Sequence, residues 1–139
     1  MKSSHTKIIF NNYFADIPGY RFVPPKNVFS KSSENRENEC FCLKNKCTTP
    51  TGLFDMSPCK YGSPILMSWP HFYQADNKLI NDVKGLKPNQ EKHQFYFDIQ
   101  PKLGTPLRVQ ARSQINIQLY ENRNIKVAKG MKFYFVFSP

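Results

Sequence analysis

The sequence predicts a mainly β fold with short helices, in which the second half of the chain forms an antiparallel meander. Three segments indicate this class, namely residues 94–100, 107–120 and 132–137. In each segment apolar and polar residues alternate, which places them on opposite faces of a β-strand. Turn-forming residues separate the segments, at 101–106 and 121–124. We therefore expect a sheet with one apolar face and one polar face.

The segment 107–120 is the longest of the three. Its fourteen residues, at about 3.3 Å each, would make a strand of roughly 45 Å. Arginine, glutamine and asparagine occupy the even positions, and we expect them to meet water or anionic headgroups. The odd positions form the apolar face: Leu107, Val109, Ala111, Ser113, Ile115, Ile117 and Leu119. A strand of this length predicts a large sheet, because it needs long neighbours.

The first half of the chain contains two further predicted strands. Residues 17–23 read as a turn that leads into a short strand, closed by two prolines. Residues 64–69 read as a largely buried strand, because an apolar run replaces the alternation. Residues 1–15 show no pattern that predicts an element.

One helix is predicted with clear boundaries, over residues 75–85. Asp76 is suited to cap its N-terminus and Gly85 to end it. One further helical turn is expected within residues 87–92. The longer helix has an apolar face made of Leu79, Ile80 and Val83.

The composition indicates a surface with affinity for negative charge. The formal net charge is +10, which favours phosphates, anionic lipid headgroups or acidic proteins over cationic ligands. Nucleic acid is disfavoured as a partner, since no recognised binding motif accompanies the basic residues. No window approaches the roughly 20 apolar residues of a membrane span. The 40% hydrophobic content and 11 prolines suit part of a larger β-structure.

Four cysteines lie close together, at Cys40, Cys42, Cys47 and Cys59. Their spacing is compatible with disulfides, and Cys42 and Cys47 are near enough in sequence to close a small loop. Four thiolates could also hold structural zinc, although a zinc site usually begins with C-x2-4-C and not with the tighter C-x-C found here. Unlinked buried thiols are the third possibility.

Catalytic chemistry is not indicated. The sequence contains no nucleophile elbow, phosphate-binding glycine loop or His-x-x-x-His pair. His71 lies among aromatic residues, where a hydrogen-bonded structural histidine is expected rather than a ligand. We expect no enzymatic activity and no cofactor.

The order of many residues resembles the class B scavenger receptors, a family that includes fatty acid translocase, the sensory neuron membrane proteins and the lysosomal integral membrane protein. The resemblance covers about residues 16–130. It is carried by Cys40-Phe-Cys42, Cys47, Gly52, Phe54-Asp55, Cys59, Gly62, Pro64, Pro70-His71-Phe72-Tyr73-Gln74-Ala75-Asp76, Gly85-Leu86, Pro88-Asn89, Glu91-Lys92-His93, Asp98-Ile99-Gln100-Pro101, Gly104 and Gln114-Ile115-Asn116.

The resemblance implies that this is the C-terminal half of a glycosylated, disulfide-bonded ectodomain. Its fold would be an antiparallel β-barrel with short helices and an apolar tunnel, held in the plasma membrane or a lysosomal or endosomal membrane by helices absent from this chain. Residues 1–15 then remain unassigned, 16–130 are the ectodomain fragment, and 131–139 are a final strand, truncated or divergent. No Asn-x-Ser/Thr glycosylation sequence occurs.

The resemblance also implies roles for individual residues. Cys42 would pair with Cys47, whereas Cys40 and Cys59 would pair with cysteines outside this chain. The parent receptor would bind lipids, lipoproteins or anionic phospholipid surfaces and mediate their uptake or transfer. The expected tunnel lining is Val109, Ile115, Ile117 and Leu119.

Two alternatives stay open beside that reading. The chain could serve only as barrel wall, with recognition in the missing half, and the four lining residues would then be packed core. A free-standing zinc-binding module with four cysteine ligands is the third reading.

Overall fold

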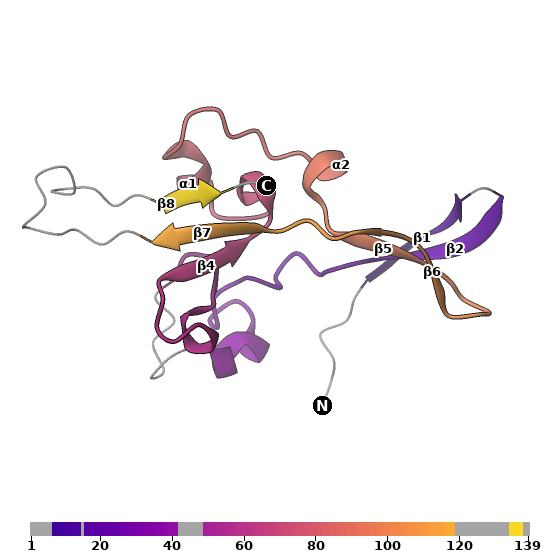
Figure 1. Ribbon diagram of the computed structural model, residues 1–139, viewed down its shortest axis with the longest axis horizontal. Helices are drawn as coiled ribbons and strands as arrows, with labels where there is room; N and C mark the ends of the chain where they lie inside the picture. Colours follow the sequence, from indigo (N-terminus) through magenta and orange to yellow (C-terminus); the bar gives the residue numbers. More distant parts are fainter. Residues whose placement is uncertain (1–6, 15, 42–48, 119–133, 138–139) are drawn as a thin grey trace, which may run out of the picture.

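The structure is a computed structural model that describes residues 7–14, 16–41, 49–118 and 134–137. It confirms the mainly β class: all strand pairs are antiparallel and short helices lie in the connections. The described strands form two four-stranded sheets, which lie toward opposite ends of an elongated molecule (Figure 1). Within the described residues these sheets stay open and do not close into a barrel.

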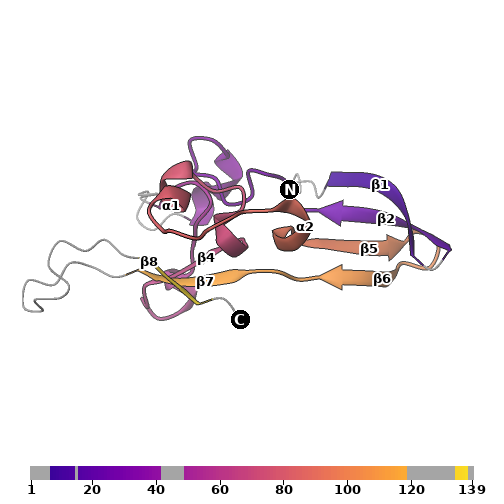
Figure 2. The ribbon, with the colours of Figure 1, turned by 90° about the horizontal axis from the view of Figure 1, so that it is seen from above.

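The first sheet has the strand order β1-β2-β5-β6. Its strands are β1 (Lys7–Phe14), β2 (Ile17–Val23), β5 (Tyr96–Gln100) and β6 (Thr105–Gln110). Figure 2 shows the four strands side by side. The predicted strand at 17–23 is therefore confirmed. β1 lies in the segment for which no element was predicted, and it pairs with β2 as a hairpin.

The second sheet has the order β3-β4-β7-β8. Its strands are β3 (Phe54–Asp55), β4 (Ile65–Ser68), β7 (Gln114–Gln118) and β8 (Tyr134–Phe137). β4 and β8 confirm the strands predicted at 64–69 and 132–137. Both of them pair with β7, which therefore lies between β4 and β8 in this sheet.

The prediction of one strand over 107–120 is wrong. The segment divides into β6 and β7, residues 111–113 between them are not strand, and the two strands belong to different sheets. The single meander is corrected in the same way, because β5 pairs in the first sheet and β8 in the second. The reason is that backbone N–H and C=O groups need partners, and the partner strands β5 and β4 are only five and four residues long.

The helices are shorter than predicted. The 3-10 helices are η1 (Arg36–Phe41), η3 (Ser57–Cys59) and η4 (Pro70–Phe72), and the α-helices are α1 (Asn77–Asn81) and α2 (Gln90–His93). Asp76 caps α1 as predicted, since its carboxylate accepts from the backbone N–H of Lys78 at 3.0 Å. The helix ends at Asn81, four residues before Gly85, so the predicted second half is not helical.

A small apolar core lies between the second sheet and α1. It consists of Leu53, Leu66, Phe72 and Leu79, each at most 4% exposed, with Ala75, Ile80 and Leu86 packed against them. Two backbone hydrogen bonds hold the turn before Leu53. The N–H of Gly52 donates to the carbonyl of Phe29 at 2.7 Å, and the N–H of Asp76 donates to the carbonyl of Thr51 at 3.0 Å. This turn therefore fixes where α1 begins.

Candidate functional site

The first sheet has an apolar face that stays open. Phe22 of β2, Phe97 of β5 and Val109 of β6 are aligned in register across three strands. The two phenylalanine rings stack, with centroids 5.6 Å apart and planes 14° from parallel. Val109 is 53% exposed. Phe22 and Phe97 are partly exposed beside it. A contiguous row of partly exposed apolar side chains indicates a surface that another apolar group covers.

Aromatic rings extend this face toward the second sheet. Phe97 contacts Phe95 edge to face at 6.0 Å, and Phe95 contacts Trp69 at 5.7 Å. Trp69 in turn lies 4.7 Å from Phe29, which lies 6.0 Å from Phe54. These centroid distances are typical of favourable aromatic pairs. The result is a continuous row of rings, here called the aromatic row (Phe22, Phe97, Phe95, Trp69, Phe29 and Phe54). Trp69 is buried and the other five rings are partly buried.

The predicted lining residues are spread over two sheets. Val109 lies on β6, next to the aromatic row, whereas Ile115 and Ile117 lie on β7 in the second sheet. Ile115 is 50% exposed and Ile117 is half-buried. Leu119 falls outside the described residues. Because β6 and β7 are separate strands, these four positions are not one continuous stripe.

The polar face of β7 is buried, contrary to the expectation that it meets water. Gln114 and Asn116 are 1% and 0% exposed. The amide nitrogen of Gln114 donates to Asn116 at 2.8 Å, and the amide nitrogen of Asn116 donates to the Ser68 hydroxyl at 3.0 Å and the Leu66 carbonyl at 3.3 Å. The face is tolerated inside the protein because these polar atoms find partners there.

The same network holds an unusual turn. Gln114 accepts a hydrogen bond from the backbone N–H of His71 at 2.9 Å. His71 and the following Phe72 both have left-handed backbone angles, with φ of 53° and 52°. Such angles are unfavourable for residues with a side chain. The buried amides of β7 therefore stabilise the turn that places Phe72 in the core.

Charged residues cross the opposite face of the first sheet. Arg21 of β2, Asp98 of β5 and Arg108 of β6 are aligned in register. Arg21 forms a two-pronged ion pair with Asp98, with both N···O distances 2.7 Å. Hydrogen bonding to this carboxylate raises the pKa of Arg21, although burial acts in the other direction. The Arg21 guanidinium also lies 3.9 Å from the ring centre of Tyr96, an attractive cation–π geometry.

Helix α2 is fixed beside this charged face by Arg112. The guanidinium nitrogen Nη1 of Arg112 donates to the carbonyl oxygens of Glu91 and Gln94, at 2.9 and 3.1 Å. The break between β6 and β7 thus has a structural role, since it carries the side chain that holds α2 in place.

His71 and His93 form a stacked pair at the base of α2. Their ring centres are 4.4 Å apart and their planes differ by 9°. Each Nδ1 accepts a backbone hydrogen bond, from Lys87 at 3.2 Å for His71 and from Asn89 at 2.9 Å for His93. The expectation that His71 is a hydrogen-bonded structural residue is confirmed. Burial lowers the pKa of His93, and the neighbouring His71, Arg112 and Lys92 lower it further.

This environment predicts that the protein loses stability on acidification. The unfolded chain takes up a proton at His93 as the pH falls through the ordinary value of 6.5, whereas the folded chain takes it up only at lower pH. The free energy of unfolding should therefore fall between pH 6.5 and the lowered folded pKa, and level off below it. Urea midpoints measured from about pH 8 to pH 5 test this. His93→Gln should reduce the slope; an unchanged slope would assign the dependence to other groups.

The structure places two of the four cysteines. Cys40 and Cys59 are exposed and free among the described residues. Cys42 and Cys47 fall outside the described residues, so their expected pairing stays a prediction.

Sequence patterns missed the charged row on β2, β5 and β6. The alternation predicts Asp98 and Arg108 on the polar face of their strands, yet Asp98 is only 2% exposed. One signal was available: Asp98 is the single carboxylate in strand β5, and an isolated charge in such a strand needs a partner if it is buried.

Comparison with known proteins gives matches over most of the chain. The CD36 family profile matches residues 5–137. Lysosome membrane protein 2 from Rattus norvegicus is 42% identical over 100 residues, which cover 72% of this chain and 20% of that protein. Scavenger receptor class B member 1 from Cricetulus griseus is 37% identical over 118 residues (85% and 21%). Protein peste from Drosophila melanogaster is 32% identical over 114 residues (76% and 20%).

The chain spans about a fifth of the length of these curated relatives. In the part of the chain that the structure describes, none of the helices has the length and apolar character needed to cross a bilayer.

Proposed function

This chain belongs to the CD36 family, and from this premise we propose that it is part of the ectodomain of a membrane receptor that binds lipids or lipoproteins. The predicted resemblance to the class B scavenger receptors is confirmed by the family match. By their names, one of these relatives is a lysosome membrane protein and another is a scavenger receptor. We accordingly propose a lysosomal, endosomal or cell-surface membrane for the parent protein, with this chain on the lumenal or extracellular side.

The observation that supports lipid binding is the open apolar face with its aromatic row. A hydrocarbon chain has no hydrogen-bonding groups, so it suits a surface made of ring faces and aliphatic side chains. The half-exposed Val109 borders this surface beside Phe97. We propose that the face closes against the rest of a barrel to form an apolar path through which lipid is taken up or transferred. The exposed Ile115 and the half-buried Ile117 of the second sheet are proposed as further lining, together with Leu119.

The test is a bulky substitution at the proposed lining in the intact receptor. Val109→Trp and Ile117→Trp should reduce lipid transfer at least severalfold while surface expression stays near normal, because a cavity accepts the ring at the expense of the ligand. Transfer of a fluorescent fatty acid and surface labelling measure the two quantities. Leu103→Trp is the control, since Leu103 is 77% exposed in the turn between β5 and β6.

Two outcomes would contradict the proposal that these residues line an apolar path. If Ile117 is ordinary packed core, the larger ring should cost about 1–3 kcal/mol of folding free energy and lower surface expression. Normal expression with unchanged transfer would instead favour the purely structural role, in which this chain is barrel wall and recognition lies elsewhere.

The cysteine pairing is a separate proposal. We propose that Cys42 joins Cys47 in a short loop and that the exposed Cys40 and Cys59 join cysteines outside this chain. Disulfide exchange requires access to the sulfur, and both Cys40 and Cys59 are exposed. Peptide mapping of the non-reduced receptor should recover the Cys42–Cys47 link; a peptide that joins Cys40 to Cys59 would contradict the assignment.

A further inference from the structure

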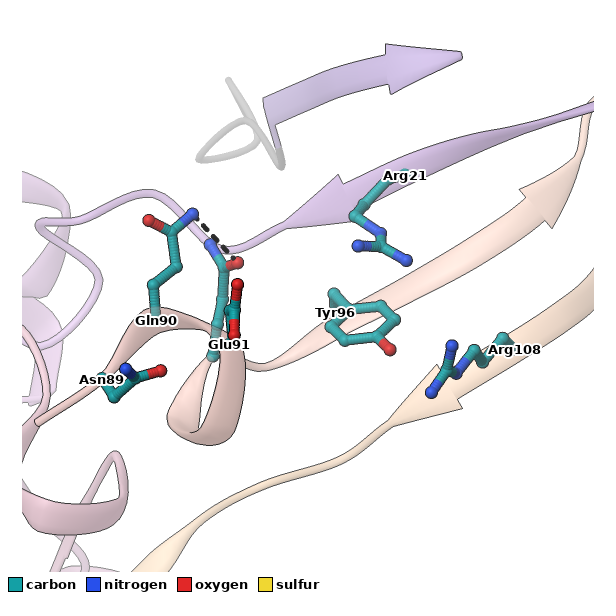
Figure 3. A pocket seen from close by; sticks show the side chains of 7 residues that line it. Arg21, Asn89, Gln90, Glu91, Tyr96 and Arg108 are labelled. Carbon is teal, nitrogen blue, oxygen red and sulfur yellow. Dashed lines mark hydrogen bonds between the residues drawn. The ribbon is translucent and has the colours of Figure 1, made fainter. Parts of the chain in front are cut away.

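A pocket of about 720 Å³ lies between α2 and the charged face of the first sheet. Figure 3 shows its construction: Gln90 and Glu91 come from α2 on one side, Arg108 comes from β6 on the other, and Tyr96 lies between them. The lining is polar or charged throughout, and consists of Arg21, Asn89, Gln90, Glu91, Gln94, Tyr96 and Arg108. It is therefore distinct from the apolar face on the other side of the sheet.

One wall of the pocket carries an unneutralised positive charge. Asp98 lies between Arg21 and Arg108 in the cross-strand register, but both of its oxygens accept from Arg21. Among the described residues Arg108 consequently has no carboxylate partner, and its guanidinium lies 5.8 Å from the ring centre of Tyr96. Arginine has five N–H donors, and Arg21 uses only two of them on Asp98. This wall offers several charge-assisted donors to an oxyanion.

The opposite wall carries a free negative charge. Glu91 is exposed, and within the described part of the chain it forms no ion pair. Next to it, the Gln90 side chain donates its amide nitrogen to Gln94 at 3.4 Å, which leaves the Gln90 amide oxygen as an acceptor. Arg112 fixes the backbone of Glu91 and Gln94. A ligand with only negative charge would meet repulsion at this wall.

We propose that the pocket binds a zwitterion of the phosphoethanolamine class, a phosphodiester joined by a short linker to a primary ammonium group. The phosphodiester oxygens accept from Arg108 and from the remaining N–H groups of Arg21. Arginine is well suited to this contact, because its planar fork matches the geometry of a phosphate. The ammonium group donates to the Glu91 carboxylate and to the amide oxygen of Gln90.

The pocket favours a primary ammonium over a quaternary one. A quaternary ammonium has no N–H donor, and proteins recognise it with the open faces of aromatic rings. The pocket has one aromatic ring, Tyr96, and Arg21 lies over it at 3.9 Å. A carboxylate and an amide oxygen instead suit a group with three N–H donors.

This inference deepens the proposed lipid-binding function and rests on it for one point, the lipid origin of the headgroup. A phosphoethanolamine group could be presented by a phospholipid or by a soluble phosphodiester. Both sources share the chemistry that Arg108 and Glu91 would recognise. The residues involved are separate from the aromatic row, so the two proposals fail independently.

The first experiment titrates the 139-residue chain with glycerophosphoethanolamine and follows binding by calorimetry or NMR. Arg108→Gln and Glu91→Gln should each weaken binding by about tenfold or more, since each removes a charge-assisted contact. Lys102→Gln and Glu39→Gln are the charge-matched controls, because both residues are exposed and neither lines the pocket. The controls should bind within about twofold of the unchanged chain, and far-UV circular dichroism checks that every variant is folded.

Comparison ligands identify the class. Glycerophosphocholine should bind at least about tenfold more weakly than glycerophosphoethanolamine. Inorganic phosphate should bind weakly, and Glu91→Gln should strengthen its binding by removing a repulsive charge. The proposal is overturned if glycerophosphoethanolamine does not bind or if the choline compound binds equally well. It is also overturned if Glu91→Gln strengthens the binding of glycerophosphoethanolamine as it does that of inorganic phosphate, or if the control variants lose as much affinity as the pocket variants.

Vesicles distinguish the two sources. If phosphatidylethanolamine in phosphatidylcholine vesicles increases vesicle binding and both pocket variants abolish the increase, the headgroup belongs to a lipid. If soluble glycerophosphoethanolamine binds but the vesicles do not discriminate, the pocket serves a soluble phosphodiester, and the lipid-binding function is tested by the Trp variants alone.

Discussion

Gly52→Ala is expected to lower the free energy of unfolding by about 3–5 kcal/mol. A methyl group at this position would collide with Cα and Cβ of Ala75, which precede the start of α1. Gly52 also has a left-handed backbone, with φ of +95°, which costs a residue with a side chain about 1–2 kcal/mol. Because Ala75 packs against the core, the collision would displace the start of α1 and with it Leu79.

Gly85→Ala is the matched control for this prediction. Gly85 has the same φ of +95°, but an added methyl group there would meet no atom within 4 Å. It should therefore lose only the backbone component, about 1–2 kcal/mol. Urea unfolding of both variants measures the difference. Equal losses would show that the close approach of Gly52 to Ala75 does not contribute to stability.

Asn116→Leu is expected to cost about 3 kcal/mol or more. The substitution leaves the buried amide nitrogen of Gln114 without its acceptor, and an unsatisfied buried group costs about 1–3 kcal/mol. It also removes one of the two hydrogen bonds of the Ser68 hydroxyl, which keeps its bond to the Trp69 carbonyl. It also frees Gln114 to move, so the left-handed turn at His71 loses its support. The buried environment makes the loss large, since water cannot replace the missing hydrogen bonds.

Ile115→Thr is the control for Asn116→Leu. Ile115 is the preceding residue of β7, but its side chain is 50% exposed, so its replacement should cost about 0.5–1 kcal/mol. The double variant Gln114→Leu with Asn116→Leu should cost less than the two single variants added together, because it removes both partners of one hydrogen bond. Additive losses would mean that the two amides stabilise the protein separately.

The chain spans about a fifth of the length of its relatives, so some properties belong to the whole protein and not to this chain. The stability differences concern contacts between described residues, such as Gly52 with Ala75. The proposed lipid transfer and the proposed disulfide pairing concern the parent protein, so their tests need the intact protein.

Local signals in the sequence determined the strands and caps that this protein has. The alternation at 94–100 and 132–137 correctly predicted strands, and Asp76 correctly predicted the start of α1. These features depend on a few neighbouring residues, because side chains alternate along any strand and an aspartate caps through its own backbone surroundings. For the same reason the order of shared residues was enough to indicate the family.

The tertiary structure alone decided which face of each strand is buried and where the long alternating segment breaks. Alternation separates two faces but does not say which one packs. Gln114, Asn116 and Asp98 lie on faces predicted to be polar, yet each is at most 2% exposed. They are buried because partners distant in sequence satisfy them: Ser68 and Leu66 for Asn116, and Arg21 for Asp98. A hydrogen bond between residues 48 to 77 positions apart leaves no local pattern in the sequence. Such long-range partners allow polar atoms to be buried, while some apolar side chains stay at the surface.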